Sequence, residues 1–132
     1  MSAPEMAGAR RGLLPALWLA TLIGLALPAS AGEADVEAVE VTLQTDGAYS
    51  FDVTIRHDDE GWSHYADRFE VLDASGAVLG TRTLFHPHVD EQPFTRSLAV
   101  AIPDGIESVV VRAHDLVHGI GGREMTVALP AR

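Results

Sequence analysis

The sequence contains no cysteine, and none of its nine basic residues is a lysine. Without cysteine the chain offers no disulfide, no thiolate metal ligand, no lipid-bearing N-terminal cysteine and no cysteine nucleophile. Nineteen aspartates and glutamates outnumber the arginines, which gives a formal net charge of −10. An acidic surface repels nucleic-acid phosphates and anionic lipids, so we expect no nucleic-acid partner and no membrane partner for the mature protein. Cations are better candidates, although the same charge also keeps a secreted protein soluble.

Familiar catalytic motifs are also missing. The sequence has no G-x-S-x-G elbow, no H-E-x-x-H helix and no phosphate-binding P-loop. Ser63 and His64 are adjacent, and neighbours in an extended loop rarely face one another as catalytic partners do. We therefore predict no enzyme. A hydrolase built on a histidine-bound metal is the remaining catalytic alternative.

The first 31 residues have the pattern of a secretory signal. Arg10 and Arg11 supply positive charge, an apolar run extends from Leu13 to Leu27, and Ala29-Ser30-Ala31 offers small residues for cleavage. A retained transmembrane anchor is the alternative, but the apolar run is short of the roughly 20 residues that span a bilayer. We predict cleavage after Ala31, a single mature domain over residues 32–132, and a periplasmic or extracellular location.

Apolar and polar residues alternate along much of the mature chain. Residues 39–44 and 51–56 alternate strictly, which is the period of a half-buried strand. No helical period of useful length appears. Further strands are expected over residues 68–73, 78–85, 97–102, 109–113 and 125–129.

Seven short strands separated by turn signals predict an all-β fold. Their spacing of about 8–12 residues is typical of a two-sheet antiparallel sandwich of immunoglobulin-like or fibronectin type. A small β-barrel is the alternative architecture. The cysteines and core tryptophan of antibody domains are missing, so the prediction concerns architecture alone.

The expected connections fall into two classes. The short ones contain Asp46-Gly47, Ala74-Ser75-Gly76 and Pro103-Asp104-Gly105. The long ones cover residues 58–67, 87–96 and 115–123. If successive strands run in opposite directions, the long connections all lie at one end of the sandwich. Function in sandwich domains is usually carried by such loops, so this end is the predicted working surface.

All six histidines lie in a long connection or on the strand residue that leads into one: His57, His64, His86, His88, His114 and His118. His86-Pro87-His88 is the best pair of metal ligands, because residues two apart in an extended segment point to the same side. His118 is the most plausible third ligand, with His64 and His114 as further candidates. His57 continues the alternation of Phe51, Val53 and Ile55, which face inward. We therefore expect it to be structural, with a carboxylate partner.

A histidine-rich site without cysteine suits Zn²⁺, Cu²⁺ or Ni²⁺ better than Cu⁺, which prefers sulfur ligands. Nearby carboxylates can orient the imidazoles: Asp58, Asp59, Glu60, Asp67, Asp90, Glu91 and Asp115. The run Asp58-Asp59-Glu60 could alternatively hold Ca²⁺, but the ligand spacing of an EF-hand is absent.

Three blocks carry a resemblance to known sequences. They are Trp62-Ser63-His64-Tyr65-Ala66-Asp67, the run from His86 to Ser97, and Val117-His118-Gly119-Ile120-Gly121-Gly122. These blocks resemble a group of small secreted bacterial proteins with no established activity, and the likeness covers about residues 49–129. The resemblance implies secretion and a single domain, and it implies no catalytic residue.

The function predicted from the sequence is that of a secreted, non-catalytic β-sandwich that binds a divalent transition metal through these loops. The alternative is a periplasmic interaction domain that docks a protein partner with Trp62, Tyr65 and Phe94 as anchors. A third reading is pH sensing, because histidines among carboxylates respond to mildly acidic pH.

Overall fold

The computed structural model describes residues 32–132, and the regular structure in this range consists of strands only. The predicted signal segment and its cleavage site lie outside the described residues, apart from Gly32, which follows that site. The eight strands in this range are β1 (Asp35–Leu43), β2 (Tyr49–Arg56), β3 (Ala66–Leu72), β4 (Val78–Thr83), β5 (Phe94–Val100), β6 (Ser108–Asp115), β7 (Gly119–Ile120) and β8 (Met125–Ala128). Across the same range, no helix has the length and apolar character needed to cross a membrane.

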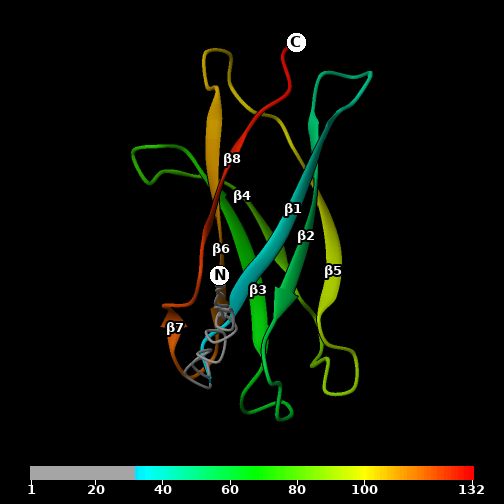
Figure 1. Ribbon diagram of the computed structural model, residues 1–132, viewed down its shortest axis with the longest axis vertical. Helices are drawn as coiled ribbons and strands as arrows, with labels where there is room; N and C mark the ends of the chain where they lie inside the picture. The colour runs from blue at the N-terminus through cyan, green and yellow to red at the C-terminus, as the bar shows by residue number, and fades with distance from the viewer. Residues whose placement is uncertain (1–31) are drawn as a thin grey trace, which may run out of the picture. The chain divides into compact units, whose positions relative to one another are not determined.

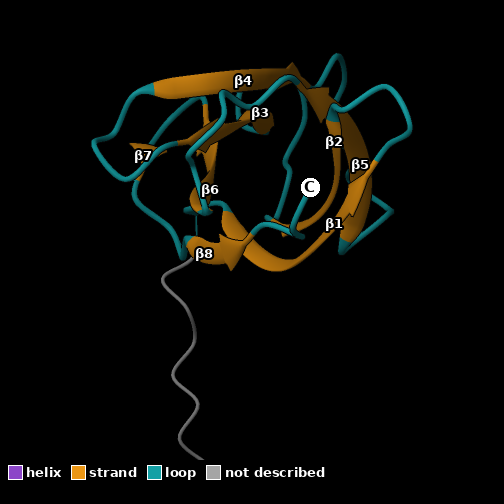
Figure 2. Ribbon diagram, turned by 90° about the horizontal axis from the view of Figure 1, so that it is seen from above, coloured by secondary structure: helices purple, strands orange, loops and turns teal. Residues whose placement is uncertain are grey.

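The strands form two antiparallel sheets. One sheet has the order β1-β2-β5, and the other has the order β4-β3-β6-β7 with β8 also paired to β6. Figure 2 shows the two sheets facing each other, with β1, β2 and β5 opposite β3 and β6. The predicted antiparallel sandwich is therefore confirmed, and the sheets are not closed into a barrel.

The strand count exceeds the sequence prediction by one. The extra strand is β7, whose two residues pair with the end of β6 through His114↔Ile120 and Asp115↔Gly119. Two residues are too few to leave an alternating pattern in the sequence. Gly119 has φ +72°, a left-handed conformation that glycine adopts without strain, so the chain can turn directly into β7.

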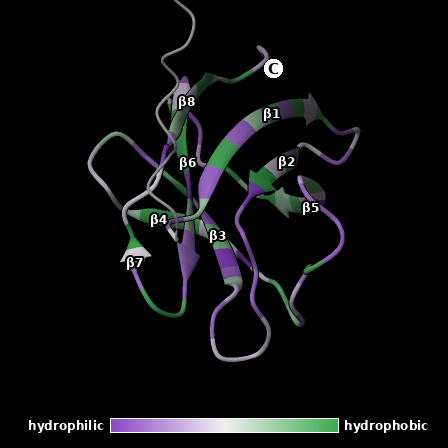
Figure 3. Cartoon of the chain, turned by 60° about the horizontal axis from the view of Figure 1, so that its bottom comes forward, coloured by the Kyte–Doolittle hydropathy of each residue, from purple (hydrophilic) through white to green (hydrophobic). Residues whose placement is uncertain are grey.

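The core follows from the alternation of apolar residues. Phe51, Val53 and Ile55 on β2 are fully buried, and they meet residues such as Phe69 and Val111 from the opposite sheet. On β1 Val36 is fully buried and the apolar positions Val39, Val41 and Leu43 are partly buried, and the alternation of apolar and polar residues along this strand gives the bands of green and purple in Figure 3. With no disulfide available, this core supplies the main stabilisation of the domain.

Three connections lie together at one end of the sandwich, the lower end in Figure 1. Two are long, the β2–β3 loop (57–65) and the β4–β5 loop (84–93), whereas the β6–β7 loop (116–118) is short because β7 interrupts the long connection expected over residues 115–123. We call this the loop end. The start of the described chain also reaches it, because the Gly32 carbonyl contacts His57 and His64.

Candidate metal centre

Asp59 is the buried carboxylate that joins two of the loops. Its side chain accepts hydrogen bonds from His57 Nδ1 at 2.5 Å, from the Ala66 amide at 3.0 Å and from the His88 amide at 2.7 Å. Burial by itself would raise the pKa of Asp59, but these hydrogen bonds outweigh it and hold the pKa below its ordinary value. Asp59 is therefore a charged group that fixes the β2–β3 loop against the β4–β5 loop.

His57 follows the last residue of β2 and is only 2% exposed. Its Nδ1 donates to Asp59, and its Nε2 donates to the Gly32 carbonyl oxygen at 2.8 Å. Burial lowers the pKa of His57, yet the hydrogen bonds to Asp59 and Gly32 raise it above the ordinary value overall. The ring is thus held in one orientation, with Nε2 directed toward the first described residue.

His64 reaches the same place from near the end of the β2–β3 loop. Its Nδ1 is hydrogen-bonded to the Glu60 carboxylate, and its Nε2 lies 3.4 Å from the Gly32 carbonyl oxygen. The hydrogen bond to Glu60 raises the pKa of His64 above its usual range. The rings of His57 and His64 meet edge to face with centroids 4.8 Å apart.

Asp115 closes this group from the opposite sheet. It is the last residue of β6, and its fully buried Oδ1 accepts hydrogen bonds from the amides of Val117 at 2.9 Å and His118 at 2.8 Å. Burial would raise the pKa of Asp115, but these backbone donors keep it lowered. Its Oδ2 is buried without a hydrogen-bond partner within residues 32–132. A buried charged oxygen left without a donor is costly, which makes it a natural place for a cation.

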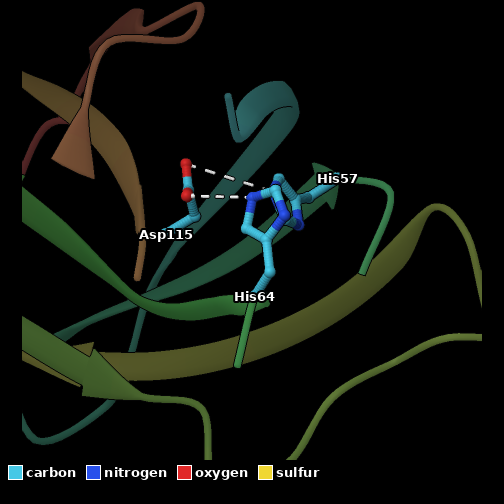
Figure 4. A group of neighbouring side chains, drawn as sticks. All are labelled: His57, His64 and Asp115. Carbon is cyan, nitrogen blue, oxygen red and sulfur yellow. Dashed lines mark ion pairs between the residues drawn. The ribbon is translucent and has the colours of Figure 1, made fainter. Parts of the chain in front are cut away.

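The ligand atoms of His57, His64 and Asp115 all lie within 4.8 Å of one another. Figure 4 shows the three side chains directed toward one another. His64 Nε2 is 3.3 Å from Asp115 Oδ1, and His57 Nε2 is 4.0 Å from Asp115 Oδ2. Tetrahedral bonds of about 2.0–2.1 Å place neighbouring donors about 3.3 Å apart, so the first pair already has this spacing and the second needs a small approach. In both imidazoles a carboxylate holds Nδ1, as is usual for metal-binding histidines, while Nε2 faces the Gly32 carbonyl oxygen and Asp115.

His118 lies beside this group and is hydrogen-bonded to one of its members. Its ring centroid is 5.1 Å from that of His64, and its Nδ1 is 3.1 Å from Asp115 Oδ1. The other side of the ring packs against Gly32. Of the histidines predicted as ligands, His64 belongs to the group and His118 borders it.

The predicted pair His86 and His88 lies elsewhere at the loop end. Their ring centroids are 4.6 Å apart, but His88 Nε2 accepts a hydrogen bond from Arg96 at 2.9 Å, and the His88 ring stacks on Phe94. Burial, followed by the nearby Arg96 charge, lowers the pKa of His88 and favours the neutral ring. His86 is exposed. The structure therefore does not place this pair with His118 in a group of metal-ligating side chains within the described residues, and the Arg96 guanidinium occupies Nε2 of His88.

His114 lies in β6 and is engaged by a carboxylate of the neighbouring strand. Its Nδ1 is 2.5 Å from Asp67 Oδ1, which places it outside the group of His57, His64 and Asp115. Sequence reasoning expected His57 to be structural with a carboxylate partner, and Asp59 is that partner. The sequence analysis did not predict that Nε2 of the same ring lies near Asp115. Two features of the sequence pointed to this contact: His57 continues the inward-facing positions of its strand, and Asp115 lies at the end of a strand.

Comparisons with known proteins give two similarities. No family model matches the chain. The chain is 46% identical over 95 residues to a Halomicrobium mukohataei protein named "Putative lipoprotein", a match that covers 70% of this chain and 47% of that protein. The chain thus spans about half the length of this curated relative. Among solved structures it is similar to a superoxide reductase (1Fe-SOR) from Giardia intestinalis, with a TM-score of 0.44, 15% identity, and coverage of 72% of this chain and 99% of the other.

Proposed function

We propose that the protein is a non-catalytic β-sandwich module that binds one divalent transition-metal ion between His57, His64 and Asp115. One observation supports this most directly. Two imidazoles, each with Nδ1 held by a carboxylate, direct Nε2 toward a third, buried carboxylate that has an oxygen without a donor. This arrangement differs from solvated surface histidines, because two of the three side chains are fully buried.

The donor set indicates the class of ion. Two imidazole nitrogens and a carboxylate oxygen suit Zn²⁺, Cu²⁺ or Ni²⁺, while Cu⁺ prefers sulfur. An ion would take the place of the protons that Nε2 of His57 and His64 share with the Gly32 carbonyl. Asp59 and Glu60 would remain on the two Nδ1 atoms and keep the rings oriented.

The proposed location is outside the cytoplasm. The basic and apolar pattern of residues 1–31 supports export, as does the name of the Halomicrobium mukohataei relative. Export with cleavage after Ala31 would place Gly32 at the start of the mature chain and the metal group directly beside it.

The test is a titration of the purified, exported protein with Zn²⁺ and Cu²⁺ by isothermal calorimetry. We expect uptake of about one equivalent at micromolar ion and a higher melting temperature in its presence. The variant His64→Ala should lose uptake. Its matched control is His86→Ala, an exposed histidine of the same loop end outside the group, which should bind as the wild type does. Absence of uptake by the wild type, or equal loss in both variants, would refute the proposal.

A second candidate is the docking of a protein partner on the same loop end. Five large apolar side chains are exposed on its three loops: Trp62, Phe85, Val89, Leu116 and Val117. Of the anchors expected from the sequence, Trp62 is 67% exposed, Tyr65 packs against it, and Phe94 is buried beneath His88. Trp62 is therefore the side chain on which this function would depend most.

Docking is tested by affinity capture from cell-envelope extracts with quantitative identification of the bound proteins. A genuine partner should be lost with Trp62→Ala and retained with Val78→Ala, which removes an exposed apolar side chain from β4. Equal recovery with both variants would argue against docking at the loop end.

A further inference from the structure

We propose that the backbone carbonyl oxygen of Gly32 is the fourth ligand of the metal ion. The inference rests on the proposed function, because it completes the same site. It would make the site an N2O2 set formed by two imidazoles, one carboxylate and one main-chain carbonyl. Every residue has a backbone carbonyl, so the sequence cannot indicate which carbonyl binds an ion. Only the folded structure identifies Gly32.

Distances support this fourth ligand. Gly32 O lies 2.8 Å from His57 Nε2 and 3.4 Å from His64 Nε2. Asp115 oxygens lie 3.3 Å and 4.0 Å from the same two nitrogens. The separations of 3.3 Å and 3.4 Å match the edge of about 3.3 Å expected for a tetrahedral ion with bonds of 2.0–2.1 Å, while the hydrogen bond of 2.8 Å is shorter and the separation of 4.0 Å is longer. Each Nε2 atom thus lies near the Gly32 oxygen and near an oxygen of Asp115, so an ion that binds both imidazoles would lie close to both of these groups.

Glycine is required at position 32 because there is no room for a Cβ. A Cβ at this position would stand 2.3 Å from His118 Cε1 and 2.8 Å from His118 Nε2. Any other residue must therefore move either the Gly32 backbone or the His118 ring, and moving the backbone takes the carbonyl away from the two imidazoles.

The fourth ligand gives the ion a structural effect. It would connect the first described residue to the β2–β3 loop and to the end of β6, three places that are far apart in the sequence. A carbonyl and a carboxylate beside two imidazoles form a harder donor set than imidazoles alone, which further disfavours Cu⁺. The ion would therefore hold the beginning of the mature chain against the loop end.

The experiment compares Gly32 with a glycine that has no contact with the proposed ligands. Gly76 in the turn between β3 and β4 has φ +91°, and a Cβ there would meet no heavy atom within 4 Å among the described residues. Gly76→Ala therefore measures the general cost of replacing a glycine of this domain, without the clash against His118. Zn²⁺ affinity is measured by calorimetry on the wild type, on both variants, on His118→Ala and on the double variant Gly32→Ala/His118→Ala, with circular dichroism to verify folding.

We expect Gly32→Ala to bind Zn²⁺ about tenfold or more weakly than the wild type, and Gly76→Ala to stay within about threefold of it. His118→Ala should bind normally, and the double variant should recover part of the affinity because the clash is gone. If the wild type binds Zn²⁺ and folded Gly32→Ala binds equally well, the carbonyl is not a ligand, although the proposed metal site stands. If His118→Ala itself abolishes binding, His118 is the fourth ligand and this inference fails. If the wild type takes up no ion, the proposed function fails.

Discussion

Replacing Asp59 by alanine should destabilise the domain more than any single surface change. The carboxylate is fully buried and accepts three hydrogen bonds, from His57 Nδ1 and from the amides of Ala66 and His88. Alanine would leave these three donors buried without an acceptor. Each unsatisfied buried donor costs about 1–3 kcal/mol, and breaking a buried ion pair costs about 3–5 kcal/mol, so we expect a loss of about 3–5 kcal/mol in the free energy of unfolding.

Such a loss is a large share of the total stability. Domains of this size have unfolding free energies of about 5–15 kcal/mol, and a change of 1 kcal/mol shifts the melting temperature by roughly 4–8 °C. The assay is equilibrium unfolding in urea followed by circular dichroism, at pH 7 and without added metal. Asp59 orders the two loops before any ion enters, so the effect does not depend on the proposed metal.

Asp46→Ala is the matched control. That aspartate also accepts a backbone hydrogen bond, from the Ala48 amide at 2.9 Å, but in the exposed turn between β1 and β2. Water can replace this acceptor, so a loss of about 1 kcal/mol or less is expected. If Asp59→Ala also cost less than about 1 kcal/mol, Asp59 would not be what fixes the β2–β3 loop against the β4–β5 loop.

Two further predictions concern the rest of the sandwich. Burial raises the pKa of Glu70, but the hydrogen-bonded guanidiniums of Arg112 and Arg68 outweigh burial and lower the pKa below the ordinary 4.5. A depressed carboxyl pKa stabilises the fold at pH above the unfolded-state value, and this stabilisation is lost as the pH falls through the folded-state value. Glu70→Gln should therefore be less stable than the wild type by about 1–2 kcal/mol at pH 7, as measured by urea unfolding. The difference in stability should shrink below about pH 4.5, and a difference that grows in acid would contradict a lowered pKa of Glu70. Phe51→Ala removes a fully buried ring and should cost about 3–5 kcal/mol in the same assay, whereas a cost below about 1 kcal/mol would mean that the ring is not part of the packed core.

Most of the architecture could be predicted from the sequence, because burial in a strand leaves a period of two that can be read without knowing the partners. The alternation over residues 51–56 corresponds to β2, whose apolar side chains are buried in the core. The long connections likewise appear where polar residues, glycine and proline interrupt the alternation. β7 could not be predicted in this way, since two residues carry no period.

The sequence by itself determined that the histidines gather at one end of a sandwich, because strand alternation places the connections that carry them at that end. It could not decide which imidazoles face one another. That choice depends on contacts between segments distant in the chain: Arg96 engages His88, Asp67 engages His114, and Asp59 orients His57. The Gly32 carbonyl and the buried oxygen of Asp115 enter the group only through the pairing of loops and strands. Only the tertiary structure could therefore assemble the site, because the position of a donor atom depends on packing and loop conformation as well as on residue type.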